Sequence, residues 1–381
     1  MEADLKALGE IDRERDTQEK ISLKDCIMLA AQESGQHVFK MTFKMLKLYR
    51  KHKISAQEFL DYGLYRSELS KEDKARFIAG FKHADIATQC SDLSWLAVTE
   101  DKFLCQEFLK SSSIPTPKTL AVIDISERDY LDVPHITNVE TLKQFCLEGD
   151  RLPFFAKENR AVGRVRAFVV ESANEEELEL KHHGSMTYEQ FFDEMVFDRT
   201  YLVQPYLKNH AFFEPLTDHL ATVRIYNFVS EDEIYQPFFV LKIPNSTNLS
   251  GNFWSEGNVG CQVDGASGKI IKSVLKTPES IMVCDESTEL YQYLEGKVLP
   301  DWAQIVQLSQ RVARVFQPVS FQSLEFAMTD QGPVLLEVNT GGSFDLPQAI
   351  TQEGFLTDKV KAFFESHGVE VKYSMKLRKC P

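Results

Sequence analysis

Glu325, Glu337 and Asn339 have side chains and spacings that could bind a divalent cation. Glu337 and Asn339 are two residues apart in an apolar run, so in a strand they project from the same face. Glu325 lies in the preceding apolar run, and the turn-forming tetrad Thr329-Asp-Gln-Gly332 joins the two runs. Two carboxylates and an amide oxygen that converge from a hairpin suit Mg²⁺, or Mn²⁺, and could also hold nucleotide phosphates through the metal. The alternative is an ordinary hairpin with solvated surface carboxylates.

Four basic residues could neutralise such phosphates. Lys157 follows the apolar run LPFFA, Arg224 lies inside the run ATVRIYNF, and Lys242 ends the run FFVLK. Basic residues embedded in apolar strands seldom stay unpaired, so they either meet acidic partners or hold an anion. Lys102 opens a helix directly after two acidic residues, and for this lysine a solvated position on the helix is the alternative interpretation.

Short apolar runs that alternate with helical patterns begin near residue 91 and predict the elements that position these side chains. Strands are predicted at residues 119–123, 154–157, 167–170, 201–203, 221–229, 236–242, 260–264, 270–272, 322–328 and 333–338. Helices are predicted at residues 99–109, 175–180, 188–194, 303–316 and 357–366. The last two strands form the predicted antiparallel hairpin. Gln204-Pro205-Tyr206 ends the strand at 201–203, where the chain is expected to cross to another body.

The first 90 residues are predicted to form a helical scaffold. An apolar pattern over residues 26–48, with basic residues on the other face and no proline, predicts one amphipathic helix. Ser55 with Glu58, and Ser70 with Asp73, are typical of capping boxes that open further helices.

Composition limits the classes of partner. The chain has 381 residues, of which 43% are hydrophobic and 26% charged, which is enough apolar material for two or three subdomains. The formal net charge is −14 and the pI is near 5.2. Because an acidic surface repels phosphate backbones and anionic lipids, neither nucleic acid nor a membrane is expected as a partner. A locally basic cleft for a small anion stays compatible with this charge.

The seven cysteines are scattered singly and include no C-x-x-C pair. The odd count and wide spacing argue against a disulfide framework and against structural zinc, and they predict free thiols in a reducing compartment. The N-terminus is charged and has no apolar leader, and no apolar run approaches the ~20 residues of a transmembrane helix. The expected location is therefore the cytoplasm.

Several of these residues together resemble a family. In order and spacing, Lys102, Lys157, the segment VQPYL that ends at Leu207, Glu325 and the segment LEVN that ends at Asn339 are similar to the ATP-grasp superfamily. The closer resemblance is to its sugar-transfer-associated branch. That resemblance also covers Asp61–Leu69, Pro215–Ile225, Asn252-Phe253 and Glu337–Gln348.

The resemblance implies an α+β chain with the ATP-grasp fold, in which two α+β subdomains clasp ATP after a helical N-terminal region. The expected divisions are a helical region at 1–90, an N-terminal subdomain with the ATP lid at 91–205, and a C-terminal catalytic subdomain with the metal-binding hairpin at 206–381. The family's glycine-rich lid is reduced here to Ala161-Val-Gly163. Glu325 stands where the branch often has aspartate.

The resemblance also implies roles for single residues. Lys102 and Lys157 would contact ATP phosphates, and Gln204, Pro205, Tyr206 and Leu207 would form the hinge beside adenine. Glu325, Glu337 and Asn339 would bind magnesium. Arg224 would face the phosphoryl group in transfer, and the catalytic set would be completed by Lys242, Asn252 and Asn339.

The implied activity is that of an ADP-forming ligase. ATP, with Mg²⁺, would activate a small-molecule carboxylate as an acyl phosphate, which an amine or related nucleophile then attacks. An ATP-dependent small-molecule kinase on the same fold stays open as an alternative, as does a non-catalytic nucleotide-binding module. ATP, the carboxylate and the nucleophile are the expected partners, and a homo-oligomer stays open.

Overall fold

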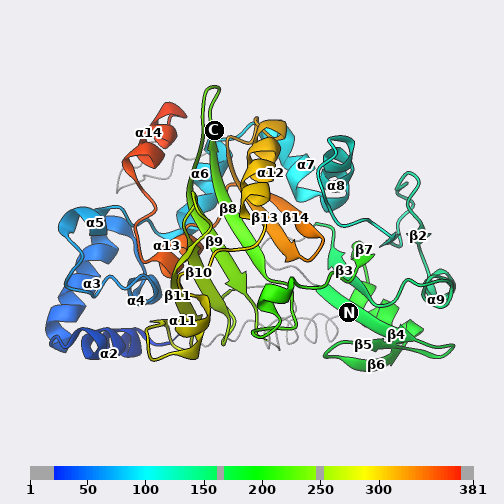
Figure 1. The fold of residues 1–381 in the computed structure, drawn as a ribbon, viewed down its shortest axis with the longest axis horizontal. Helices are drawn as coiled ribbons and strands as arrows, with labels where there is room; N and C mark the ends of the chain where they lie inside the picture. Colours follow the sequence, from blue (N-terminus) through cyan, green and yellow to red (C-terminus); the bar gives the residue numbers. More distant parts are fainter. Residues whose placement is uncertain (1–20, 161–166, 246–252, 370–381) are drawn as a thin grey trace.

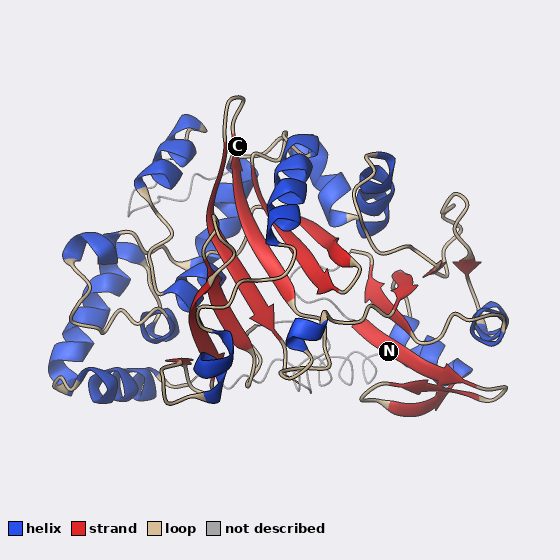
Figure 2. Ribbon diagram, in the orientation of Figure 1, coloured by secondary structure: helices blue, strands red, loops and turns tan. Residues whose placement is uncertain are grey.

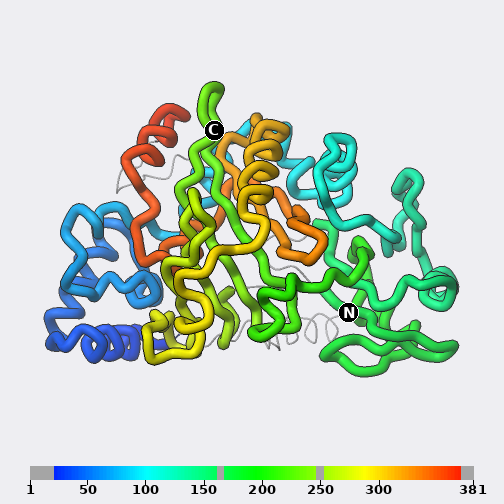
Figure 3. The backbone as a smooth tube through the Cα atoms, in the orientation of Figure 1, coloured from blue at the N-terminus to red at the C-terminus, as the bar shows by residue number. Residues whose placement is uncertain are grey.

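A computed structural model of the chain describes residues 21–160, 167–245 and 253–369. Two seven-stranded sheets organise them, the first at one end of the molecule, the second in the middle and the N-terminal helices at the other end (Figure 1). Figure 3 shows the same progression along the backbone tube, from the blue N-terminal helices past the central sheet to the teal and green segments of the first sheet.

The first sheet has the order β2-β1-β7-β3-β4-β5-β6. Its strands are β1 (Ala121–Ile123), β2 (His135–Ile136), β3 (Phe154–Glu158), β4 (Ala167–Ala173), β5 (Glu177–Leu180), β6 (Gly184–Thr187) and β7 (Tyr201–Pro205). Its helices are α9 (Val139–Leu147) and α10 (Tyr188–Phe191), the latter continuing as a π-helical turn, Phe192–Val196. Apolar residues of these helices pack with Phe154, Phe168 and Val203 in one buried cluster.

The second sheet is antiparallel throughout and has the order β12-β11-β10-β9-β8-β13-β14. Its strands are β8 (Thr222–Val229), β9 (Ile234–Ile243), β10 (Val259–Val263), β11 (Ile270–Lys276), β12 (Ile281–Val283), β13 (Phe321–Thr329) and β14 (Gly332–Thr340). The helices after β12 are α11 (Glu289–Leu294), α12 (Trp302–Val315), α13 (Asp345–Thr351) and α14 (Asp358–Ser366).

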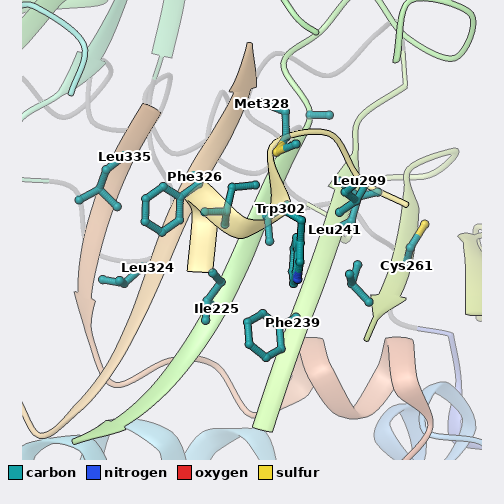
Figure 4. Close-up of a cluster of buried hydrophobic side chains, with 14 of the residues drawn as sticks. Ile225, Phe239, Leu241, Cys261, Leu299, Trp302, Leu324, Phe326, Met328 and Leu335 are labelled. Atoms are coloured by element: carbon teal, nitrogen blue, oxygen red, sulfur yellow. The ribbon is translucent and has the colours of Figure 1, made fainter. Parts of the chain in front are cut away.

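The largest hydrophobic core lies on one face of this second sheet, under α12 (Figure 4). Ile225, Leu241 and Leu324 point into it from neighbouring strands, and Trp302 meets them from the helix. Figure 2 shows α12 lying in front of the strands. Because side chains alternate along a strand, the residues between these apolar ones point to the opposite face. That opposite face is the one that can carry polar chemistry.

The described residues that precede the first sheet are mostly helical. Their helices are α2 (Leu23–Ser34), α3 (Val38–His52), α4 (Ala56–Asp61), α5 (Lys71–Ala75), α6 (His83–Gln89), α7 (Leu96–Glu100) and α8 (Lys102–Ser111). Both predicted capping boxes are confirmed. The side chain of Ser55 accepts from the backbone N–H of Glu58, and the Glu58 side chain accepts from the backbone N–H of Ser55. Ser70 and Asp73 form the same two hydrogen bonds. The six cysteines within the described residues are free and buried.

All of the strands predicted from the sequence are confirmed with shifted ends, as is the hairpin of β13 and β14. The helix predicted at 175–180 is wrong, because its two leucines, Leu178 and Leu180, alternate and are buried as the inner face of strand β5. The single helix predicted over 26–48 is two helices, α2 and α3, because Gly35 takes a left-handed φ of 62° and caps α2. The helix predicted at 99–109 is also divided, at Asp101, whose carboxylate caps α8.

Asp61, at the end of α4, predicts an unusual dependence of folding on pH. Burial raises its pKa to about 7, although Gln57 and Lys276 lower it, and Asp345 and Glu58 add to the rise. Between about pH 4 and pH 7 the folded chain therefore holds a proton that the unfolded chain releases, so the free energy of unfolding falls as the pH rises. The substitution Asp61→Asn should flatten the melting temperature across this range and raise it at pH 8. An unchanged profile would mean that the carboxylate is ionised in the folded state.

Candidate active site

A row of charged residues crosses the polar face of the second sheet. Arg224 on β8 lies opposite Glu325 on β13, which in turn lies opposite Glu337 on β14. Lys242 on β9 lies opposite Thr222, two residues before Arg224. The strand register thus brings four of the predicted residues and Thr222 onto one face, with the two cations on β9 and β8 beside the two carboxylates on β13 and β14.

Glu325 lies at the centre of this row and is fully engaged by cations. Its Oε2 accepts from Arg224 Nη2 at 2.6 Å, and its Oε1 accepts from Lys242 Nζ at 2.6 Å and from Thr222 Oγ1 at 3.1 Å. Burial alone would raise the pKa of Glu325, but Lys242 and Arg224 hold it well below the usual range. Arg224 therefore has the buried carboxylate partner that a purely structural role would require. Its Nε is nevertheless buried without a hydrogen-bond partner among the described residues.

Glu337 is held much more loosely than Glu325. Among the described residues its one ion pair is to Lys102, with Nζ to Oε1 at 3.8 Å, and 21% of its side chain is exposed. Asn339, on the same face, donates from Nδ2 to the carbonyl oxygen of Ser323 at 3.5 Å, which leaves its side-chain oxygen available to other groups. The oxygens of Glu337 and Asn339 are therefore the accessible ones on the hairpin.

Lys157 connects the two sheets. It lies on β3 of the first sheet, and its Nζ donates to the carbonyl oxygen of Leu336 on β14 at 3.1 Å. Burial lowers its pKa, Glu337 raises it and Lys102 lowers it further. No ion pair within 4.0 Å is found for Lys157 among the described residues. Since its ammonium group has three hydrogens and one of them bonds to the carbonyl of Leu336, two remain available to donate to another group at the site.

Lys102 is positioned by the end of β3. It is the first residue of α8, and its backbone N–H donates to the carbonyl of Asn159, while the next N–H, of Phe103, donates to Asn159 Oδ1 at 2.9 Å. Asn159 is completely buried and lies two residues after Lys157. One asparagine thus fixes the backbone that carries both lysines.

Asn159→Ala should therefore weaken nucleotide binding about fivefold, equivalent to about 1 kcal/mol, because losing the hydrogen bond from the Phe103 N–H to Asn159 Oδ1 allows Lys102 to move. Titration calorimetry with a nucleotide measures this effect. Asn138→Ala is the control, since Asn138 Oδ1 also accepts from a backbone N–H in the first turn of a helix, that of Thr141 in α9, and lies beside the first sheet, not at the charged row. It should lower the melting temperature comparably and leave nucleotide affinity unchanged. Equal losses of affinity in both variants would contradict the positioning role.

The predicted hinge comprises the last two residues of β7 and the two residues that follow it. Gln204 is buried, lies opposite Phe155 and projects on the same face of the first sheet as Lys157. Its Nε2 has no partner among the described residues. Pro205 is the last residue of β7, Tyr206 is half-buried with its hydroxyl accepting from Lys181 Nζ at 3.3 Å, and Leu207 is half-buried. A buried amide donor without a partner is the kind of group that a polar ligand satisfies.

Two predicted features lie outside the described residues, namely Asn252 and the lid segment Ala161-Val-Gly163. Three residues at the row were not assigned roles from the sequence: Thr222, Ser323 and Asn159. Thr222 and Ser323 could have been found by the two-residue period of a strand, because each precedes a charged residue by two positions. Asn159 had no such signal, since its bonds are to a helix 56 residues away in sequence.

The donor set fits an anionic nucleotide carried with a hard metal ion. Four cations, Lys102, Lys157, Arg224 and Lys242, gather around two carboxylates, which leaves a local excess of positive charge on a chain of net charge −14. Ser323 Oγ, opposite Asn339 in the hairpin, is buried without a partner among the described residues. Glu337 and Asn339 offer oxygen ligands of the kind that magnesium and manganese take.

The sequence model of the family described as sugar-transfer associated ATP-grasp matches residues 83–363. Among curated proteins, none matches the chain. Solved structures similar to it include D-alanine–D-alanine ligase from Bacillus anthracis, at 13% identity and a TM-score of 0.39, covering 76% of this chain and 75% of that one. The D-alanine–D-alanine ligase from Coxiella burnetii has 13% identity and a TM-score of 0.40, covering 73% and 61%.

N5-carboxyaminoimidazole ribonucleotide synthetase from Thermotoga maritima has 12% identity and a TM-score of 0.32, covering 64% of this chain. The chain spans 42% of that protein. The family match, in contrast, runs from α6 to α14 and includes both sheets, the hairpin and the charged row. The chain therefore belongs to the sugar-transfer associated ATP-grasp family.

Proposed function

We propose that the chain is an ATP-dependent ligase that activates a carboxylate through an acyl phosphate. The observation that carries this proposal is the gathering of four cations from two sheets and a helix around Glu325 and the loosely held Glu337. A surplus of buried positive charge is costly unless an anion compensates it, and nucleotide phosphates are such an anion.

Each residue then has a task that its position supports. Lys102 and Lys157 bind phosphate oxygens, and Gln204 to Leu207 meet the adenine edge. Glu337 and Asn339 bind magnesium, which supplies charge neutralisation and orientation to the phosphates. Glu325 can be a third ligand without losing its ion pairs, because a carboxylate has about four lone-pair sites and three are in use.

The chemistry proceeds by positioning and charge neutralisation. A carboxylate oxygen of the substrate attacks the γ-phosphorus, the bond to the bridging oxygen breaks, and ADP leaves. An amine then attacks the acyl carbon, the bond from carbon to the phosphate oxygen breaks, and the amine loses a proton. Arg224 and Lys242 face the phosphoryl oxygens whose charge is spread in the transfer, where fixed cations stabilise most.

The test is hydroxylamine trapping. The purified chain is incubated with ATP, Mg²⁺ and a panel of carboxylates, and ADP and hydroxamate are measured together. An acyl phosphate gives both products in equal amounts, whereas a kinase that acts on a hydroxyl gives ADP and a stable phosphoester with no hydroxamate. ADP formation without hydroxamate for every carboxylate that stimulates it would overturn the proposal. Nucleotide binding without any ADP formation would favour the non-catalytic module.

A further inference from the structure

Helix α3 lies at the end of the molecule away from the first sheet (Figures 1 and 3). It carries a row of exposed apolar side chains. Phe39 is 82% exposed, Phe43 71% and Leu46 45%. Their spacing of four and three residues places them on one face of the helix. Met41 and Met45, which are buried against α2 and α4, occupy another face. The exposed row therefore takes no part in the packing of α3 onto the protein.

The same helix is strongly basic. Residues 38–53 contain six basic residues and no acidic one, in a chain whose net charge is −14. On the helix, Lys40, Lys44 and Lys47 form a stripe beside the exposed apolar row, at the same three- and four-residue spacing. A large apolar stripe next to a cationic stripe is typical of helices that lie in a lipid–water interface.

Neighbouring elements add to this charge. Burial lowers the pKa of Lys44, Lys74 and Lys82, and a nearby cation lowers each of them further: Lys40, Lys44 and Lys53, respectively. Among the described residues, Lys40, Lys47 and Lys82 form no ion pair within 4.0 Å. The lowered pKa values show that cations on this end of the molecule repel one another, although Glu68 partly offsets this effect on the pKa of Lys74.

We propose that α3 docks the protein on an anionic lipid surface. Phe39, Phe43 and Leu46 enter the boundary between headgroups and acyl chains, and the lysine stripe lies at the level of the lipid phosphates. No helix among the described residues is long and apolar enough to cross a bilayer. The net charge, from which no membrane partner was expected, is a sum over the whole chain. Docking depends instead on the charge of the one face that meets the lipid.

Charge complementarity selects the lipid over a second copy of the chain. Two copies that met through α3 would bring their two lysine stripes together, which is repulsive at the distances of a dimer interface. The acidic remainder of the chain is repelled by an anionic bilayer and so orients α3 toward it. An acidic protein could also neutralise the lysines, and the experiment below separates it from the lipid.

The test is sedimentation of the full chain with vesicles of phosphatidylcholine alone or with phosphatidylglycerol. The wild type should bind the anionic vesicles, bind the neutral ones at least about tenfold more weakly, and be released by salt. The double variant Phe39→Ser, Phe43→Ser should lower the partition coefficient about tenfold or more. The pair Ile125→Ser, Leu131→Ser is the matched control, because both side chains are exposed at the opposite end of the molecule. It should bind like the wild type.

Absence of binding by the wild type to anionic vesicles at low salt would overturn the proposal and direct attention to an acidic protein partner. Equal binding of the Phe39/Phe43 variant and the wild type would overturn it as well. A wild-type dimer that dissociates in this variant would assign the face to a second copy instead. ADP formation should be the same in all of these variants, since none of the changed residues belongs to the charged row, and this keeps the result independent of the proposed ligase activity.

Discussion

Glu337→Gln should lower the rate of ADP formation by about a thousandfold or more, equivalent to about 4 kcal/mol of barrier, and leave the melting temperature nearly unchanged. The substitution keeps the shape of the side chain and removes an anionic oxygen from the proposed metal site. Folding should be less affected than by a change at Glu325, because 21% of the Glu337 side chain is exposed and its ion pair to Lys102, the one found among the described residues, is long at 3.8 Å.

The matched control is Glu171→Gln, which removes the same charge from an exposed position on β4. Its rate of ADP formation should equal that of the wild type. The rates are measured at saturating ATP over a series of magnesium and manganese concentrations. If Glu337→Gln retains turnover within about tenfold of the wild type, a difference of only ~1.4 kcal/mol, Glu337 is not a metal ligand.

Glu325→Gln should instead lower the melting temperature by several degrees. The variant leaves Arg224 and Lys242 as two buried cations without their shared carboxylate, and breaking a buried ion pair in this way costs about 3–5 kcal/mol. The pKa of Glu325 lies well below its unfolded value, so its contribution to the free energy of unfolding is present above about pH 4.3 and is lost as the pH falls below that. The variant should therefore lose less of its remaining unfolding free energy between pH 5 and pH 3 than the wild type does.

A second substitution checks the cause. Adding Lys242→Met to Glu325→Gln removes one of the two repelling cations and should recover part of the lost melting temperature. Lys242→Met alone should lower it, because Glu325 then keeps only Arg224 and Thr222 as partners. A melting temperature of Glu325→Gln equal to that of the wild type would mean that the carboxylate is replaceable in the fold, contrary to its central position in the row.

The hairpin, with Glu337 and Asn339 on one face of it and Glu325 on the paired strand, was accessible from the sequence for simple reasons. The turn between β13 and β14 is short, the strand period is two, and both together fix which side chains share a face. The sequence did not reveal that Glu325 is held by two buried cations whereas Glu337 is loosely held. It depends on Arg224 and Lys242, which lie about 80 to 100 residues away in sequence and reach Glu325 only through the pairing of β8 with β13 and β9.

The predicted helix boundaries were wrong where the conformation or the capping side chain of a single residue ends one helix and begins the next. Gly35 and Asp101 divide patterns whose apolar periodicity runs on across the break, so the periodicity alone cannot locate them. In β5, the acidic residues favour a solvated helix, but the burial of two leucines in the first sheet stabilises a strand instead. The hinge glutamine and the lid could be assigned only through the family resemblance, since neither has a chemical signature of its own.

The hydrogen bond from Lys157 to the carbonyl of Leu336 has a thermodynamic consequence for the two sheets. The ammonium has two further hydrogens, so it can bind a phosphate and stay attached to β14. Any rotation of one sheet against the other moves this ammonium relative to the hairpin. Binding at the proposed nucleotide site and the range of angles between the two sheets are therefore thermodynamically linked. A ligand bound to Lys157 would restrict the angles that the sheets adopt. A change elsewhere that widens this range must then reduce the binding free energy of the ligand by the same amount.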